Sequence, residues 1–168
     1  MISARDLEQV YTEHGNAVFA YLLNLSRSES VSQDLLHELF LKLSQRSSLA
    51  WRLVRHKRRY LLRSAYCLFI DHCRREKLRA QTLDDFGNHS HLFESTPAND
   101  ANGELVTEWL GKLPADQRSI VHLKIWEELT FREIAKLLDI PPDTAASRYR
   151  YALDKLRAMQ RQSTKDHA

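Results

Sequence analysis

Hydrophobic residues recur at helical spacing through the first eighty residues of the chain. A first face is formed by Leu7, Val10, Tyr11, Val18, Tyr21, Leu22 and Leu25. Ser3, followed by Asp6 three positions later, makes a weak capping box before this face. Ser30 or Ser32 can cap a second helix, whose apolar stripe is Leu35, Leu36, Leu39, Phe40 and Leu43. A third long helix is expected from Arg58 to about Arg79, and no stretch alternates as a strand would.

The pattern changes at residues 81–103, "QTLDDFGNHSHLFESTPANDANG", where polar and small residues replace the apolar repeat. Proline is absent before Pro97, and Gly15 is the only glycine of the first 86 residues. We therefore predict an all-α protein of two small helical domains joined by a flexible linker. The predicted limits are 1–80 for the first domain, 81–103 for the linker, 104–160 for the second domain and 161–168 for a tail.

The second domain predicts a helix-turn-helix arrangement. Thr130 with Glu133 forms a capping box before a short helix, and Pro142 suits the first turn of a longer one. In a helix-turn-helix, the early residues of the second helix face the DNA major groove. The residues in that position are Thr144, Ser147, Arg148, Arg150 and Tyr151. Arginine and hydroxyl side chains can bond to bases and phosphates, which favours DNA binding over the alternative, a plain trihelical unit with a polar outer face.

Charge is distributed very unevenly along the chain. The net charge of the whole chain is +3, but between Arg46 and Arg79 eleven Lys and Arg residues stand against two acids. This segment therefore carries +9 and the remainder −6. Such asymmetry suggests that a polyanion, most simply nucleic acid, docks on the segment. The alternative is a solvated basic helix face.

Several classes of protein are excluded by what the sequence lacks. The longest apolar run, 17–23, is too short to span a membrane, and no secretory signal opens the chain, so we expect a cytoplasmic protein. Cys67 and Cys73 have no disulfide or metal-site spacing, and we interpret both as core or neutral positions. The histidines have no zinc-like spacing beyond His89 and His91. We expect no cofactor, no metal and no catalytic residues, and hence not an enzyme.

The stretch "LPADQRSIVHLKIWEELTFREIAKLLDIPPDTAASRYRYALDKLR" resembles region four of the extracytoplasmic function sigma factors. Its Leu113-Pro114, Gln117-Arg118, Leu129-Thr130-Phe131, Glu133-Ile134-Ala135, Ile140, Thr144, Ser147-Arg148 and Leu156-Arg157 fall at the spacing of that family. The stretch "SQDLLHELFLKL" is similar to region 2.2 of the family, and "YLLRSAYCLFIDHCRREKLR" to regions 2.3 and 2.4. The resemblance covers most of the chain.

This resemblance implies a transcription initiation factor that binds core RNA polymerase, directs it to a subset of promoters and assists strand opening. The polymerase-binding positions would be Asp34, Glu38 and Leu41, which lie on the flank of the second helix left over beside its apolar stripe. Promoter DNA around the minus-ten element would be contacted by Arg55, Lys57, Arg58, Arg59, Tyr60, Arg63, Tyr66, Asp71, Arg74 and Arg75. The helix-turn-helix would bind the minus-thirty-five element. Family membership also implies an anti-sigma factor as a partner.

Alternatives remain open at this stage. Tyr66 can equally be a core residue, and His72 can touch DNA or simply lie at the surface. The chain departs from the family at two places in the first domain. Arg58-Arg59 precede the aromatic-leucine pair Tyr60-Leu61, where family members commonly have a Phe or Gly-rich segment, and Cys67 replaces a frequent asparagine. Ala146, Tyr151 and Leu153 replace frequent basic residues, which predicts a weaker phosphate grip. A free-standing helix-turn-helix regulator that never binds polymerase, or a decoy that keeps only the fold, are the competing functions.

Overall fold

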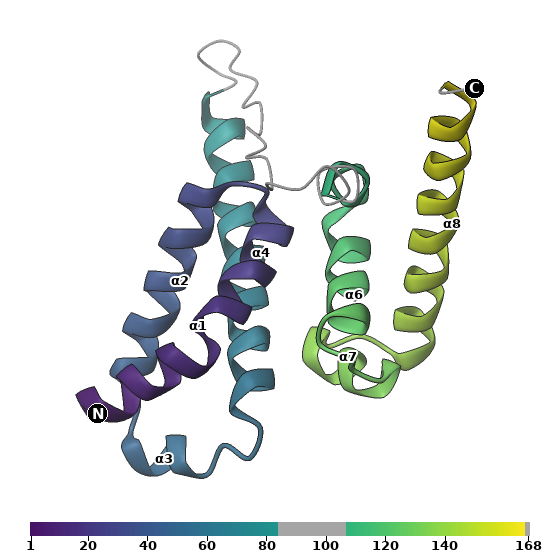
Figure 1. Cartoon of the computed structure of the whole chain (residues 1–168). Helices are drawn as coiled ribbons and strands as arrows, with labels where there is room; N and C mark the ends of the chain where they lie inside the picture. Colours follow the sequence, from purple (N-terminus) through teal and green to yellow (C-terminus); the bar gives the residue numbers. More distant parts are fainter. Residues whose placement is uncertain (84–106, 167–168) are drawn as a thin grey trace. The chain divides into compact units, whose positions relative to one another are not determined.

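The computed structural model describes residues 1–83 and 107–166, and all regular structure in these segments is helical. The chain divides into two compact units, Met1–Ser95 and Thr96–Ala168 (Figure 1). The predicted class, all-α with two small helical domains, is confirmed. Most of the predicted linker, 81–103, lies outside the described residues.

The first unit is built on three long helices that all pack against one another. They are α1 (Ala4–Ser26), α2 (Glu29–Ser44) and α4 (Lys57–Leu83). Their apolar stripes meet in a shared core, in which Tyr21, Leu22, Leu61 and Leu62 are completely buried. A short helix, α3 (Ser48–Arg52), lies between α2 and α4 in the sequence. The sequence did not predict α3.

The junction between α1 and α2 corrects one prediction. Ser28 is the N-cap of α2, because its Oγ accepts a hydrogen bond from the Val31 amide at 3.3 Å. The predicted caps were wrong: Ser30 lies inside the helix, and Ser32 is buried there, donating to the Ser28 carbonyl at 2.7 Å. Arg27 turns the chain between the helices with a left-handed backbone, φ 58°.

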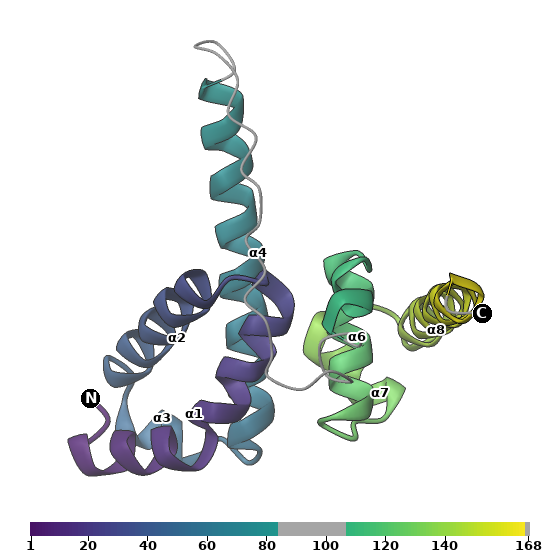
Figure 2. The same cartoon turned by 45° about the horizontal axis from the view of Figure 1, so that its top comes forward.

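Helix α4 is longer than the part of it that packs. Its core-facing residues end at Phe69, and residues 73–81 are all exposed. Its last turns continue past the ends of α1 and α2 (Figure 2). It ends at Leu83, a few residues beyond the predicted limit near Arg79.

The described part of the second unit consists of a helical stretch at 107–111 followed by α6 (Ala115–Ile125), α7 (Phe131–Leu138) and α8 (Pro142–Asp166). Helices α6, α7 and α8 all contact one another. One cluster of the core joins Leu110, Leu113, Val121 and Ala152. Helix α8 continues to Asp166, past residue 160 where we predicted the domain to end.

The turn between α7 and α8 forms as the sequence predicts. Thr130 accepts a hydrogen bond from the Glu133 amide at 3.3 Å, and the Glu133 carboxylate accepts one from the Thr130 amide at 2.9 Å, so the capping box is complete. Asp139 ends α7 with a left-handed backbone, φ 57°, and Pro142 is the first residue of α8. This short helix, tight turn and longer helix is the helix-turn-helix arrangement.

Candidate functional site

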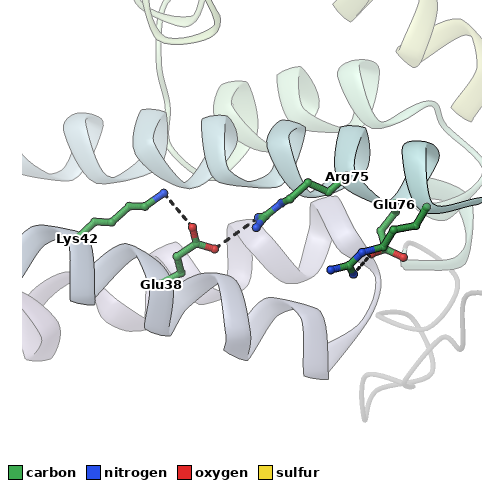
Figure 3. A network of polar contacts seen from close by, with 5 residues as sticks. Glu38, Lys42, Arg75 and Glu76 are labelled. Carbon is green, nitrogen blue, oxygen red and sulfur yellow. Dashed lines mark hydrogen bonds and ion pairs between the residues drawn. The ribbon is translucent and has the colours of Figure 1, made fainter. Parts of the chain in front are cut away.

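The flank of α2 that we predicted to bind polymerase is only partly open to solvent. Asp34 is exposed, and Leu41 is exposed over 62% of its surface. Glu38 is half-buried. Its carboxylate forms ion pairs with Lys42 Nζ at 2.8 Å and with Arg75 Nη2 of α4 at 3.6 Å (Figure 3).

These partners affect the ionisation of Glu38. The hydrogen bond from Lys42, helped by the positive charges of Lys42 and Arg75, holds the pKa of Glu38 below its ordinary value, although partial burial acts in the opposite direction. The carboxylate is therefore fully ionised at neutral pH.

A groove between α2 and α4 joins two sets of predicted residues. It has a volume of about 240 Å³ and is lined by Val31, Asp34, Leu35, Glu38, His72, Arg75, Glu76 and Arg79. The polymerase candidates Asp34 and Glu38 thus lie beside Arg75, a DNA candidate. The sequence did not predict that these two sets would meet.

The basic candidates of the first unit are mostly accessible. The exposed ones are Arg55, Lys57, Arg58, Arg63, Arg74 and Arg75, whereas Arg59 is half-buried. Asp71 forms an ion pair with Arg74 at 3.4 Å, in which both side chains are more than half exposed. Such a pair contributes little to stability because water screens it, so Arg74 remains available to an incoming phosphate.

The two tyrosines that we predicted as ring faces for bases are both half-buried. Tyr60 packs against Trp51, with ring centroids 5.8 Å apart at 72°. The Arg46 guanidinium lies over the Tyr60 ring, 4.8 Å from its centroid. One face of Tyr60 is thus already occupied in the free chain.

The predicted recognition residues of α8 fall into two groups. Arg150 and Tyr151 are exposed, Tyr151 over 63% of its surface. Thr144, Ser147 and Arg148 are half-buried. Ser147 donates a hydrogen bond to the Thr144 carbonyl at 3.1 Å within the helix.

Arg148 makes a contact that its position in the sequence did not reveal. Its Nε lies 3.4 Å from Asp116 Oδ2 on α6. The side chain therefore links two helices of the unit, and any substitution of Arg148 changes this link as well as the predicted contact to DNA.

Arg118 is a structural residue whose role the sequence did not show. Only 7% of it is exposed, and its guanidinium donates to the carbonyls of Leu110, Gly111 and Leu113 at 3.4, 3.3 and 2.9 Å. The first two carbonyls lie in the last turn of the helical stretch 107–111 and the third follows it, so Arg118 caps the end of this stretch. The signal available was the Gln117-Arg118 pair after Leu113-Pro114.

Comparison with known proteins finds relatives that span both units. Residues 109–158 match the family described as Sigma-70, region 4. The sigma factor SigM of Bacillus subtilis is 24% identical over 164 residues, covering 95% of this chain and 98% of SigM. SigL of Mycobacterium tuberculosis H37Rv is 26% identical over 157 residues, covering 90% of this chain and 86% of SigL. Both relatives are described as extracytoplasmic function RNA polymerase sigma factors. Residues 109–158 therefore match sigma region 4, and the chain is similar to extracytoplasmic function sigma factors along almost its whole length.

The structural likeness extends over both units. RpoE of Bartonella quintana, solved in complex with the anti-sigma factor NepR, has a TM-score of 0.74 at 17% identity and covers 94% of this chain and 98% of its own. The resemblance predicted from the sequence is therefore confirmed in its fold and in its family.

The likeness to sigma factors supports a transcription factor, the class that the sequence predicted. Within residues 1–83 and 107–166, no three acidic, cysteine or histidine side chains gather in a way that could hold a metal ion. None of the helices in those segments is long and apolar enough to cross a membrane. Cys67 and Cys73 are both exposed on α4, so neither is a core residue. The spacing of His89 and His91 falls outside the described residues.

Proposed function

We propose that this sigma factor binds core RNA polymerase, directs it to a subset of promoters and assists strand opening. The observation that carries the proposal is the likeness to whole sigma factors across both units, together with two separate basic surfaces, on α4 and on α8. A free-standing helix-turn-helix regulator would need only the second unit. The relatives span the first unit as well, which supports the polymerase-binding function over that alternative.

Polymerase binding is assigned to Asp34, Glu38 and Leu41. An exposed leucine beside two carboxylates suits a basic and apolar partner surface, because the leucine adds buried area and the acids add charge complementarity. The Glu38 carboxylate already has two cationic partners, so Asp34 and Leu41 are the more accessible of the three.

Promoter DNA is assigned to both units, the minus-ten element to residues 1–80 and the minus-thirty-five element to residues 104–160. In the first unit, the cationic candidates hold the backbone while bases leave the stack. In the second unit, Arg150 and Tyr151 are best placed to reach DNA without rearrangement, and Thr144, Ser147 and Arg148 lie deeper on the same helix. No side chain of the chain itself carries out chemistry, which remains with the polymerase.

An anti-sigma factor is the further partner that we propose. The structural neighbour RpoE is described in complex with one, the anti-sigma factor NepR. A partner of this kind would cover the polymerase or DNA surfaces until a signal releases them. We place the protein in the cytoplasm, where bacterial transcription occurs.

The test of the polymerase assignment is co-purification with core enzyme. Asp34→Arg reverses an exposed charge on the α2 flank, and we expect it to lower the affinity for core polymerase by at least about tenfold. Glu8→Arg is the matched control, because Glu8 is also exposed but lies on α1. Equal affinities of Asp34→Arg and Glu8→Arg would overturn the assignment.

A further inference from the structure

The connection between α2 and α4 is attached to its unit by one buried side chain. Among residues 45–58, Trp51 alone is buried, with 3% of its surface exposed, and Val54 is half-buried. The backbone hydrogen bonds of Trp51 are local: its amide donates to the Ser47 carbonyl at 3.0 Å, and its carbonyl accepts from the Val54 amide at 3.1 Å. The Trp51 ring is therefore what holds this connection in place.

The ring is held by two residues of α4, and one of these is in turn covered from the end of α2. Trp51 packs edge to face against Tyr60 of α4, and Lys57 Nζ lies over the Trp51 ring, 5.6 Å from its centroid. Arg46, which directly follows α2, covers Tyr60 at 4.8 Å. Both cations lie within the distance of about 6 Å at which a ring attracts a cation. These four residues, the Trp51 cluster, join the end of α2, helix α3 and the start of α4, which meet at one end of the unit (Figure 1).

The segment that this cluster holds is strongly cationic. Residues 45–59 contain no acidic residue and six basic ones, which are Arg46, Arg52, Arg55, Lys57, Arg58 and Arg59. A cationic segment with a fixed backbone binds a polyanion at a lower entropic cost than one that must first be ordered. The position of these charges therefore depends on Trp51, a residue that is itself too buried to contact DNA.

We propose that Trp51 is a positioning residue for promoter opening. Tyr60 contributes to this role by packing against the Trp51 ring. The inference rests on the proposed function, since it concerns the strand-opening step. It differs from the direct role that the sequence suggested for Tyr60, because here the tyrosine orders the cationic connection and need not stack on a base.

The first arm of the test uses the full chain without polymerase. Trypsin cuts after Arg46, Arg52 and Arg55 in proportion to the local opening of the connection. We expect Trp51→Ala to speed these cuts by at least about tenfold, with unchanged helical content by circular dichroism. Trp51→Phe, which keeps an anchoring ring, should stay close to the wild type. The matched control is Leu49→Ala, because Leu49 lies on α3 with 68% of its surface exposed.

The second arm uses the reconstituted holoenzyme on a promoter fragment that the wild type transcribes. Permanganate oxidation of unpaired thymines measures opening. We expect Trp51→Ala to reduce opening of the duplex by about tenfold and Trp51→Phe to restore it. A second fragment has the same sequence, but its bubble is already unpaired. On this fragment the difference between Trp51→Ala and the wild type should shrink to less than about threefold, because the energy of unpairing no longer has to be supplied. Tyr60→Leu, which removes the ring contact but stays apolar, should act in the same direction if Trp51→Ala fails to fold.

Either of two results overturns the proposal: normal opening by the variants that lose the ring contact, or an equal loss of opening in Leu49→Ala. The second result would mean that promoter opening depends on the exposed surface of α3 and not on the buried Trp51 ring. If the wild-type holoenzyme opens no promoter, the proposed function fails instead, and the trypsin rates still decide whether Trp51 holds the connection.

Discussion

The buried guanidinium of Arg118 gives the sharpest prediction about the second unit. In the variant Arg118→Met, a side chain of similar length keeps most of the apolar packing but cannot donate to the carbonyls of Leu110, Gly111 and Leu113. A hydrogen bond from a charged donor contributes about 1.5–3 kcal/mol. The 2.9 Å bond should be near the top of that range, and the two longer ones add less.

We therefore expect Arg118→Met to lower the free energy of unfolding of this unit by about 3 kcal/mol. A unit of this size has a total stability of roughly 3–9 kcal/mol, so the loss is a large fraction of it. The melting temperature should fall by more than about 10 °C.

Hydrogen–deuterium exchange of the full chain under increasing urea measures this change for each unit separately. Amides of α6 and α7 should lose protection, whereas those of α1 and α2 should keep it. The control is Arg132→Met, the same replacement at an exposed position of α7. If Arg118→Met and Arg132→Met have the same stability within about 0.5 kcal/mol, the role given to Arg118 is refuted.

Three further predictions concern a cap, an ion pair and a DNA contact. Thr130→Ala removes the capping box of α7 and should lower the stability of the second unit by about 1 kcal/mol, as read from the urea dependence of exchange; an unchanged midpoint would contradict it. Glu38→Gln removes the pairs with Lys42 and Arg75. Because the pKa of Glu38 is lowered by folding, its stabilisation is present above the ordinary value of 4.5 and is lost as the pH falls below it. Thermal melts should show a gap between the variant and the wild type at pH 7 that closes toward pH 3, and a gap that persists at pH 3 would rule out the ion pairs as its cause. Arg150→Ala should weaken holoenzyme binding to the upstream promoter and reduce the slope of log affinity against log salt by about 0.9, and an unchanged slope would mean that Arg150 neutralises no phosphate.

Helix caps could be predicted from the sequence where the two residues that form the cap lie within one turn of each other. The capping box of Thr130 and Glu133 and the start of α8 at Pro142 are confirmed, because a cap depends only on residues three positions apart. The cap of α2 was misplaced because three serines compete there. The choice depends on the left-handed Arg27, which turns the chain so that Ser28 reaches the free amides.

Ion pairs between different helices could not be predicted from the sequence pattern. The Arg148–Asp116 pair depends on how α6 and α8 cross, and the Glu38–Arg75 pair on how α2 and α4 cross. Periodicity fixes which face of a helix is apolar, but it does not fix which polar residue at the edge of that face meets another helix. The same limit explains why two predicted surfaces of the first unit turned out to share one groove.

Helix α3 was missed for a different reason. It has five residues, too few to show a helical repeat, and its surroundings are cationic. Its order comes from Trp51, whose partner Tyr60 lies on another helix. Trp51 is a single aromatic residue in a basic segment, and its position in the sequence did not indicate that it would be buried against another helix.

Run-off transcription by purified core RNA polymerase on genomic fragments tests the central claim most directly. We predict that adding this chain produces transcripts from a limited set of start sites, that neither protein makes them alone, and that Asp34→Arg abolishes them while Glu8→Arg does not. Absence of any transcript that depends on the chain, combined with binding of the chain to DNA fragments as a dimer without polymerase, would contradict the account.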